Sequence, residues 1–206
     1  NCGISLAPLS TDRRPPAPID LVAEEPQDFF ESFGAYLDAL DSDPPAVNAA
    51  CQVGHSTLRV AAMDRLDRAA DPGEIRTMRS NLEASLDAGA IGMSTGLYYP
   101  PAIEAPTEEV IELARALDDA IHTTHMRDEA DGVAQSLEET FAIGQAAKVP
   151  VVISHHKCAG QKNHGRSMET LAMIEQARTH QSIGLDVYPY AASSTMLDPE
   201  RVGEVS

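Results

Sequence analysis

The sequence contains no apolar run that approaches the roughly 20 residues of a membrane span, so we expect no membrane partner. Positive charge is scarce, since 15 lysines and arginines stand against 32 acidic residues and the formal net charge is −17. This balance argues against nucleic acid as a partner and favours a soluble protein, expected in the cytoplasm with the periplasm as the alternative. The three cysteines form an odd count without the spacing of a disulfide framework.

The length and composition are those of one globular domain. The chain has 206 residues, of which 43% are hydrophobic and 23% charged, which is enough for a substantial core. It starts at Asn1 without a methionine or a signal sequence, and it ends at Ser206 soon after a motif-rich stretch. We therefore expect residues 1–206 to be the central part of a longer protein, truncated at both ends.

Segments typical of strands and helices alternate along the chain. Apolar spacing predicts helices at residues 28–40, 71–89, 107–117, 133–147 and 167–179. Asp71, with Glu74 three residues later, and Thr107 are the expected N-caps of the second and third of these helices. The strands between them are expected to end near Cys2, Val53, Met93, His125, His155 and Tyr188. Such alternation predicts an α/β fold with parallel strands adjacent in chain order. The chain would supply about six of the eight βα units of a (β/α)8 barrel of the TIM type, and its open edges would favour association.

Residues 149–157 join a β-branched apolar segment to a cluster of ionisable side chains, and residues 121–129 and 183–190 repeat this pattern. A buried parallel strand has this sequence when its C-terminal end opens into a site. In parallel α/β barrels the chemistry lies at that edge. The histidines of two such strand ends, His125 and His155, are therefore expected to converge.

These two histidines and Cys2 are the candidate metal ligands. A catalytic zinc has three protein ligands and an open position, and imidazole and thiolate both bind it well. A single strand-end histidine is more often a hydrogen-bonded structural residue, and a single cysteine is more often a small buried hydrophobe. For the three together, spacing alone leaves the metal and the structural interpretations evenly balanced. His55, in an expected loop, is a weaker candidate.

Three further polar residues follow the strand ends. Lys157 could neutralise a substrate carboxylate there, and the hydroxyl of Tyr188 could donate to a developing oxyanion. The structural alternatives are a surface salt bridge for the lysine and aromatic packing for the tyrosine. A surface salt bridge is favoured for Arg127, which has Asp128 and Glu129 beside it.

Seven motifs carry a family resemblance. They are Asn-Cys-Gly-Ile-Ser at 1–5, Val-Gly-His-Ser-Thr-Leu-Arg at 53–59, Gly-Ala-Ile-Gly at 89–92, Tyr-Pro-Pro at 99–101, Thr-His-Met-Arg-Asp-Glu at 124–129, Ser-His-His-Lys at 154–157 and Asp-Val-Tyr-Pro-Tyr at 186–190. Together, and in this order over nearly the whole chain, they resemble the D-aminoacylases, which are N-acyl-D-amino-acid deacylases of the amidohydrolase superfamily. The resemblance implies a zinc-bearing (β/α)8 barrel with a small β-rich domain and a small-molecule substrate, an N-acyl-D-amino acid.

The resemblance also implies roles for individual residues. The implied Zn²⁺ ligands are Cys2 in Asn-Cys-Gly, His125 in Thr-His-Met-Arg and His155 in Ser-His-His-Lys. The implied substrate-binding residues are Lys157, Tyr188 and Ser194, with Tyr188 also the catalytic donor to the oxyanion.

Two parts of the family pattern are not in the sequence. The His-x-His pair is expected before Asn1 and the general-base aspartate beyond Ser206, since neither Asp128 nor Asp186 stands in the matching motif. The expected activity is zinc-dependent hydrolysis of N-acyl-D-amino acids to a carboxylate and a D-amino acid, with the chain alone inactive. Two alternatives stay open: another amidohydrolase, such as a hydantoinase-like cyclic amidase, against which Cys2 counts, and a catalytically incompetent zinc-binding fragment. The preferred D-side chain and the oligomeric state also stay open.

Overall fold

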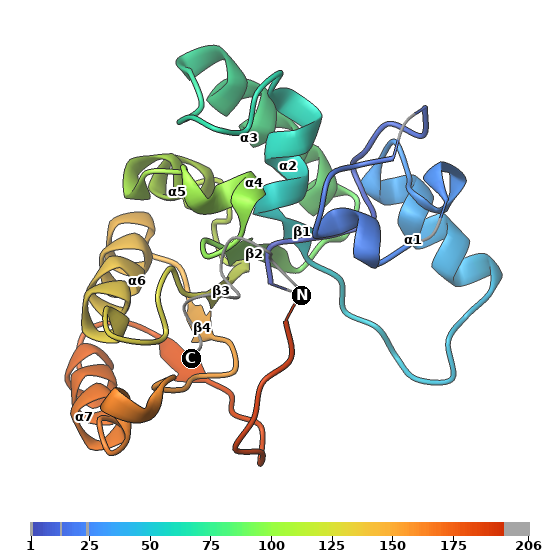
Figure 1. Cartoon of the computed structure of the whole chain (residues 1–206). Coiled ribbons are helices and arrows are strands. Elements are labelled where there is room, and N and C mark those ends of the chain that lie inside the picture. Colours follow the sequence, from blue (N-terminus) through green and yellow to red (C-terminus); the bar gives the residue numbers. More distant parts are fainter. Residues whose placement is uncertain (1, 13, 24, 196–206) are drawn as a thin grey trace.

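A computed structural model describes residues 2–12, 14–23 and 25–195, so Asn1 of the first motif lies outside the described residues (Figure 1). The described strands are β1 (Val53–Gly54), β2 (Gly92–Gly96), β3 (Ile121–His125), β4 (Val151–Ile153) and β5 (Ile183–Leu185). The α-helices are α1 (Phe33–Ser42), α2 (His55–Ala62), α3 (Pro72–Asp87), α4 (Pro100–Ile103), α5 (Thr107–Ala114), α6 (Val133–Ala147) and α7 (Ser167–Ala177). Three short 3₁₀ helices are η1 (Ile19–Leu21), η2 (Pro26–Asp28) and η3 (Gln161–Asn163).

The five strands form one parallel sheet in the order β1-β2-β3-β4-β5, which confirms the predicted α/β class and strand order. The prediction of a sixth strand near Cys2 is wrong, because that segment is a turn followed by irregular chain. In register, Gly96 at the end of β2 lies opposite His125 at the end of β3. The carboxyl ends of the strands therefore meet at one edge of the sheet.

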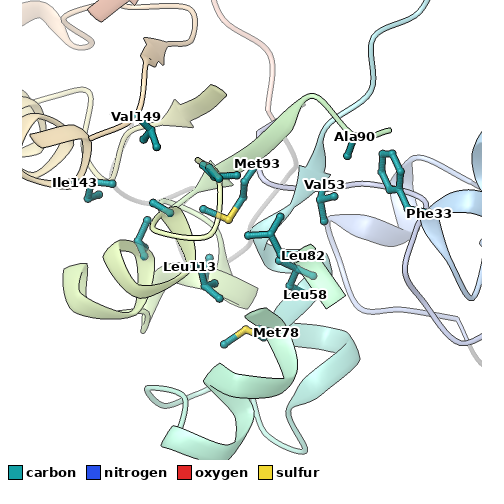
Figure 2. Packing of buried hydrophobic residues seen from close by; sticks show 14 of the residues in the cluster. Phe33, Val53, Leu58, Met78, Leu82, Ala90, Met93, Leu113, Ile143 and Val149 are labelled. Carbon is teal, nitrogen blue, oxygen red and sulfur yellow. The ribbon is translucent and has the colours of Figure 1, made fainter. Parts of the chain in front are cut away.

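Helices connect the successive strands and lie along one side of the sheet (Figure 1). Much of the strand face toward them is apolar: Val53 and Met93 share a buried cluster with helix residues such as Leu113 and with Val149 just before β4 (Figure 2). Met93 is fully buried in that cluster. Burying a side chain of this size stabilises the fold by about 1.5–3 kcal/mol, so this packing fixes the helices against the strands.

The opposite face of the sheet carries smaller and more polar side chains. Successive residues of a strand point to opposite faces, so Ser94, Thr123, Val152 and Gly184, which are aligned across β2 to β5, share the face away from the helices. Thr123 and Val152 are partly exposed and Gly184 is exposed. No helix of the described part of the chain is long and apolar enough to cross a membrane.

The helix ends test the capping predictions. Asp71 caps α3 as predicted: its carboxylate accepts from the amide of Glu74 at 2.9 Å, and the Glu74 carboxylate accepts from the amide of Asp71 at 2.8 Å. The predicted Thr107 cap of α5 is wrong, because Pro106 occupies that position and the Thr107 hydroxyl donates to Glu139 at 2.8 Å. Helix propensity thus located this helix, but the hydroxyl expected to cap it makes a tertiary contact with Glu139 instead.

Candidate metal centre

The loop that carries Cys2 lies directly on the end of β2. Cys2 and Gly3 both have positive φ, at 44° and 83°. The Gly3 amide donates to the Ser94 hydroxyl at 3.0 Å. A Cβ on Gly96 would lie 2.1 Å from the Cys2 carbonyl oxygen, and one on Gly3 would lie 2.4 Å from the Gly96 nitrogen. Glycine at both positions is therefore what allows the loop to place Cys2 at the sheet edge.

The start of α2 holds the same loop from its other side. The Ser56 amide donates to the Gly3 carbonyl at 2.9 Å. The Ser5 amide donates to the Thr57 hydroxyl, and the Gly54 amide donates to the Ser5 hydroxyl, both at 2.9 Å. Cys2 is thus positioned by β2 and by the beginning of α2 together.

The two histidines reach the edge from adjacent strands. His125 is the last residue of β3 and only 8% exposed, with the ring of Tyr99 5.1 Å away between centroids. His155 follows β4 in a left-handed conformation, with φ of 40°. The Asp186 carboxylate after β5 accepts from the His155 backbone amide at 2.6 Å. This contact stabilises an otherwise unfavourable turn, so Asp186 supports the position of the histidine.

The structure brings Cys2, His125 and His155 together, and each can offer one donor atom, all of them within 4.8 Å of one another. The Cys2 sulfur lies 3.3 Å from Nε2 of His155, and the two imidazole centroids are 4.6 Å apart. Around a tetrahedral zinc, sulfur and nitrogen donors lie about 3.5 Å apart, given bond lengths of about 2.3 and 2.0 Å. Shifts of about 1 Å or less would therefore bring this donor set to zinc geometry.

The electrostatics of the cluster suit a thiolate ligand. Burial alone would raise the pKa of the Cys2 thiol, but hydrogen bonds with His125 and His155 outweigh it and lower the pKa to about 6. Hydrogen bonds with Cys2 and Glu129 raise the pKa of His155 to about 9. At neutral pH the cluster thus holds a thiolate beside an imidazolium, and a cation can replace the imidazolium proton.

Glu129, which in the sequence is a neighbour of Arg127, lies beside this cluster. Its carboxylate oxygens are 3.1 Å from Nδ1 of His155 and 2.5 Å from Nζ of Lys157. Burial raises the pKa of Glu129, but His155, His125 and Lys157 outweigh burial, so its pKa is lowered. A carboxylate four residues after a candidate ligand at a strand end was the signal that could have identified it.

Of the expected substrate-binding residues, Lys157 contacts the cluster directly. Lys157 is held by Glu129 and lies 5.7 Å from the centroid of the Tyr188 ring. Ser194 is exposed in the segment after β5. The hydroxyl of the next residue, Thr195, lies 3.2 Å from that of Tyr99, whose ring packs on His125, so this segment reaches the rim of the cluster.

Two minor interpretations from the sequence are wrong. His55 is not in a loop near the site: it begins α2, is fully buried and lies 3.0 Å from the Glu109 carboxylate. Arg127 does not pair with its neighbours: its guanidinium donates to Glu139 at 2.8 Å and to two backbone carbonyls at the end of α4 and just after it. Asp128 accepts from backbone amides of its own loop.

Known proteins match this chain over nearly its whole length. A D-aminoacylase of Alcaligenes xylosoxydans xylosoxydans is 57% identical over 98% of the chain, and an N-acyl-D-aspartate deacylase of the same organism is 50% identical over 98%. These matches cover 42% and 41% of the two relatives, so the chain spans about two fifths of their length. No family model matches the sequence.

A solved structure is similar in fold as well as in sequence. It is the crystal structure of an N-acyl-D-glutamate deacylase from Bordetella bronchiseptica in complex with zinc and a phosphonate inhibitor that mimics the tetrahedral reaction intermediate. It is 44% identical to this chain, with a TM-score of 0.93, and the match covers 98% of this chain and 43% of that one.

Proposed function

Because the chain belongs to the family of the D-aminoacylases and N-acyl-D-amino-acid deacylases, we propose that the protein containing it hydrolyses the amide bond of N-acyl-D-amino acids to a carboxylate and a D-amino acid. One observation carries the proposal: the convergence of Cys2, His125 and His155 at the carboxyl edge of a parallel sheet. Two of the similar proteins are named for different substrates, N-acyl-D-aspartate and N-acyl-D-glutamate, so the side chain accepted stays open.

The proposed ligands of Zn²⁺ are Cys2, His125 and His155. The zinc in the deacylase from Bordetella bronchiseptica supports this choice of metal. A zinc ion there would supply Lewis acidity, polarising the acyl carbonyl and activating water for attack. The thiolate of Cys2 and the neutral imidazoles then serve as electron-pair donors, which is why the low pKa of Cys2 favours metal binding.

The remaining roles belong to side chains next to the ligands. In this proposal the ammonium of Lys157, held by Glu129, attracts the carboxylate of the substrate. The Tyr188 hydroxyl donates to the oxygen that becomes negative during attack, and Ser194, on the segment that reaches the rim, contributes a further polar contact. Homology to deacylases favours this activity over a hydantoinase-like cyclic amidase.

We further propose that residues 1–206 are the central part of a metal-dependent (β/α)8 barrel. Three features support this: the strands follow one another in chain order, helices cover one face, and the small polar face carrying Ser94 and Thr123 lies where a barrel interior would be. The other strands, the His-x-His pair and the general base would then come from residues outside this sequence. We expect the 206-residue chain alone to be a zinc-binding fragment without activity.

The first test measures zinc and activity in the protein expressed from its complete gene. We expect bound zinc and hydrolysis of N-acetyl-D-methionine, N-acetyl-D-aspartate or N-acetyl-D-glutamate, with the L-isomers as controls. His155→Ala should lose both zinc and turnover, because it removes a ligand. A protein without D-selective hydrolysis, or one whose zinc content is unchanged by His155→Ala, would contradict the proposal.

The roles of Lys157 and Tyr188 are separated by steady-state kinetics. Lys157→Ala should raise KM and leave kcat largely unchanged, because it removes a contact made equally in the ground and transition states. Tyr188→Phe should instead lower kcat on the order of 10²-fold, because its donor matters most when the carbonyl oxygen carries charge. The opposite pattern would show that the two roles are exchanged or absent.

A further inference from the structure

Glu129 is the carboxylate that lies against the basic side chains of the metal cluster. It follows β3 in the chain, and its side chain is only 12% exposed. Its Oε1 is 3.1 Å from Nδ1 of His155, and its Oε2 is 2.5 Å from Nζ of Lys157 and 3.6 Å from Nε2 of His125. It is not a member of the group of potential metal ligands found among the described residues. Its contacts are with two of the proposed ligands and with Lys157.

The hydrogen bond between Glu129 and His155 determines which ring nitrogen of His155 carries a hydrogen toward Glu129. An ionised carboxylate only accepts hydrogen bonds, so Nδ1 of the imidazole must carry the hydrogen that it donates. Nε2 then points to the other side, where the Cys2 sulfur lies at 3.3 Å. Nζ of Lys157 lies 3.0 Å from the same Nδ1, but both are donors, so they share Glu129 and do not bond to each other. By holding Nδ1, Glu129 thus determines that His155 presents Nε2 toward Cys2.

The backbone around Glu129 is held on both sides. Its carbonyl accepts from the Ala159 amide at 2.7 Å, which ties the loop after β3 to the loop after β4. Immediately before it, the Asp128 carboxylate binds two backbone amides of the same loop, and Arg127 is fixed by Glu139. A carboxylate on such a braced segment has little freedom to follow its partners, so the partners are oriented by it.

We propose that Glu129 is a positioning residue that orients the ligand His155 and the substrate-binding Lys157 with one carboxylate. The inference rests on the proposed zinc-dependent deacylase function. Its consequence is that zinc affinity depends on an acceptor at the right distance from Nδ1, whereas substrate affinity depends on the charge beside Lys157.

Two conservative substitutions separate these requirements in the protein expressed from its complete gene. Glu129→Gln keeps the length and an amide oxygen that can accept from Nδ1, but it removes the charge. Glu129→Asp keeps the charge but withdraws the oxygens by about 1.5 Å, one carbon–carbon bond. Zinc affinity is measured by competition with a chromophoric chelator, and kcat and KM are measured with the best N-acetyl-D-amino acid.

We expect Glu129→Asp to weaken zinc binding by about 10- to 100-fold, the usual loss when the partner of a ligating histidine is removed. Glu129→Gln is expected to retain most of the zinc affinity and to raise KM, because Lys157 loses its anionic partner. A merely electrostatic role predicts the reverse order for zinc. Exposed Glu138 on α6 offers a matched control, and Glu138→Gln should change neither quantity.

Failure of the proposed function and failure of the positioning role of Glu129 give different results. If the unsubstituted protein binds no zinc or hydrolyses no N-acyl-D-amino acid, the proposed function fails whatever the variants do. If it does both, the positioning role is overturned by wild-type zinc affinity in Glu129→Asp, by loss of zinc in Glu129→Gln, or by an unchanged KM in Glu129→Gln. Thermal unfolding of each metal-free variant shows whether the comparison is between folded proteins.

Discussion

The buried ion pair between α2 and α5 allows a stability prediction that can be worked out from its contacts. Glu109 is 1% exposed, and its Oε1 accepts from Arg59 at 2.5 Å. Its Oε2 accepts from the Ala70 amide at 3.1 Å. Arg59 is fully buried and also donates to the carbonyls of Pro101 and Arg68, at 2.5 and 2.6 Å. One guanidinium thus joins α2, α4, the segment before α3 and α5.

The perturbation is Glu109→Leu, which leaves the Arg59 charge buried without its counter-ion. Removing one partner of such a pair costs about 3–5 kcal/mol, a large part of the 5–15 kcal/mol that typically separates folded and unfolded states. Arg59→Met should cost a similar amount, because it leaves the buried Glu109 carboxylate without its arginine counter-ion. The double substitution should cost less than the sum of the singles by about 2–3 kcal/mol, since both remove the same interaction.

Urea unfolding followed by circular dichroism measures these free energies. The matched control is Glu108→Leu, the exposed preceding residue of α5, which should cost less than about 1 kcal/mol because only a helix-dipole interaction is lost. If Glu109→Leu costs no more than this control, or if the double substitution equals the sum of the singles, the pair does not hold these helices together and the reasoning is refuted.

Two further predictions follow from buried groups near the sheet. Burial lowers the pKa of His122 to about 4, so the unfolded state binds its proton first, and the free energy of unfolding should fall by about 3 kcal/mol as the pH drops from about 6.5 to 4. His122→Gln should flatten this part of the stability profile measured by urea unfolding, whereas His180→Gln, at an exposed position, should not. Gly96→Ala should displace Cys2 and weaken zinc binding in the chelator assay, because the added Cβ would lie 2.1 Å from the Cys2 carbonyl oxygen. Gly34→Ala, whose Cβ would meet Ala88 at 3.8 Å, is the control and should bind zinc normally.

The parts of the fold that could be predicted are those set by local sequence. The helix predicted at residues 133–147 has the bounds of α6, because its apolar period is regular and uninterrupted. The capping box at Asp71 located the start of α3. Strand order followed from alternation alone, since parallel strands need helical crossovers and consecutive units pack side by side.

The path of the chain around Cys2 could not be predicted in the same way. Two successive residues with positive φ, Cys2 and Gly3, turn the chain back onto β2, where they lie against the Gly96 backbone. That close approach is a contact between residues more than ninety positions apart. The apolar residue Ile4 gave the segment the appearance of a strand end. His125 and His155 were easier to place, because each lies at or just after the end of a strand that the sequence identifies.

The charged residues after β3 show why neighbouring opposite charges are a poor guide at a strand end. Arg127, Asp128 and Glu129 are consecutive, yet each binds a different partner: Glu139, the loop backbone and His155 with Lys157. An ion pair between exposed neighbours is worth about 0–1 kcal/mol, whereas a buried carboxylate left without donors costs several times more. The fold therefore satisfies the partly buried groups first, across elements, and leaves the local pairing unmade. A carboxylate that follows a buried strand is for that reason better interpreted by what the adjacent strands bring to the same edge than by the charge beside it in the sequence.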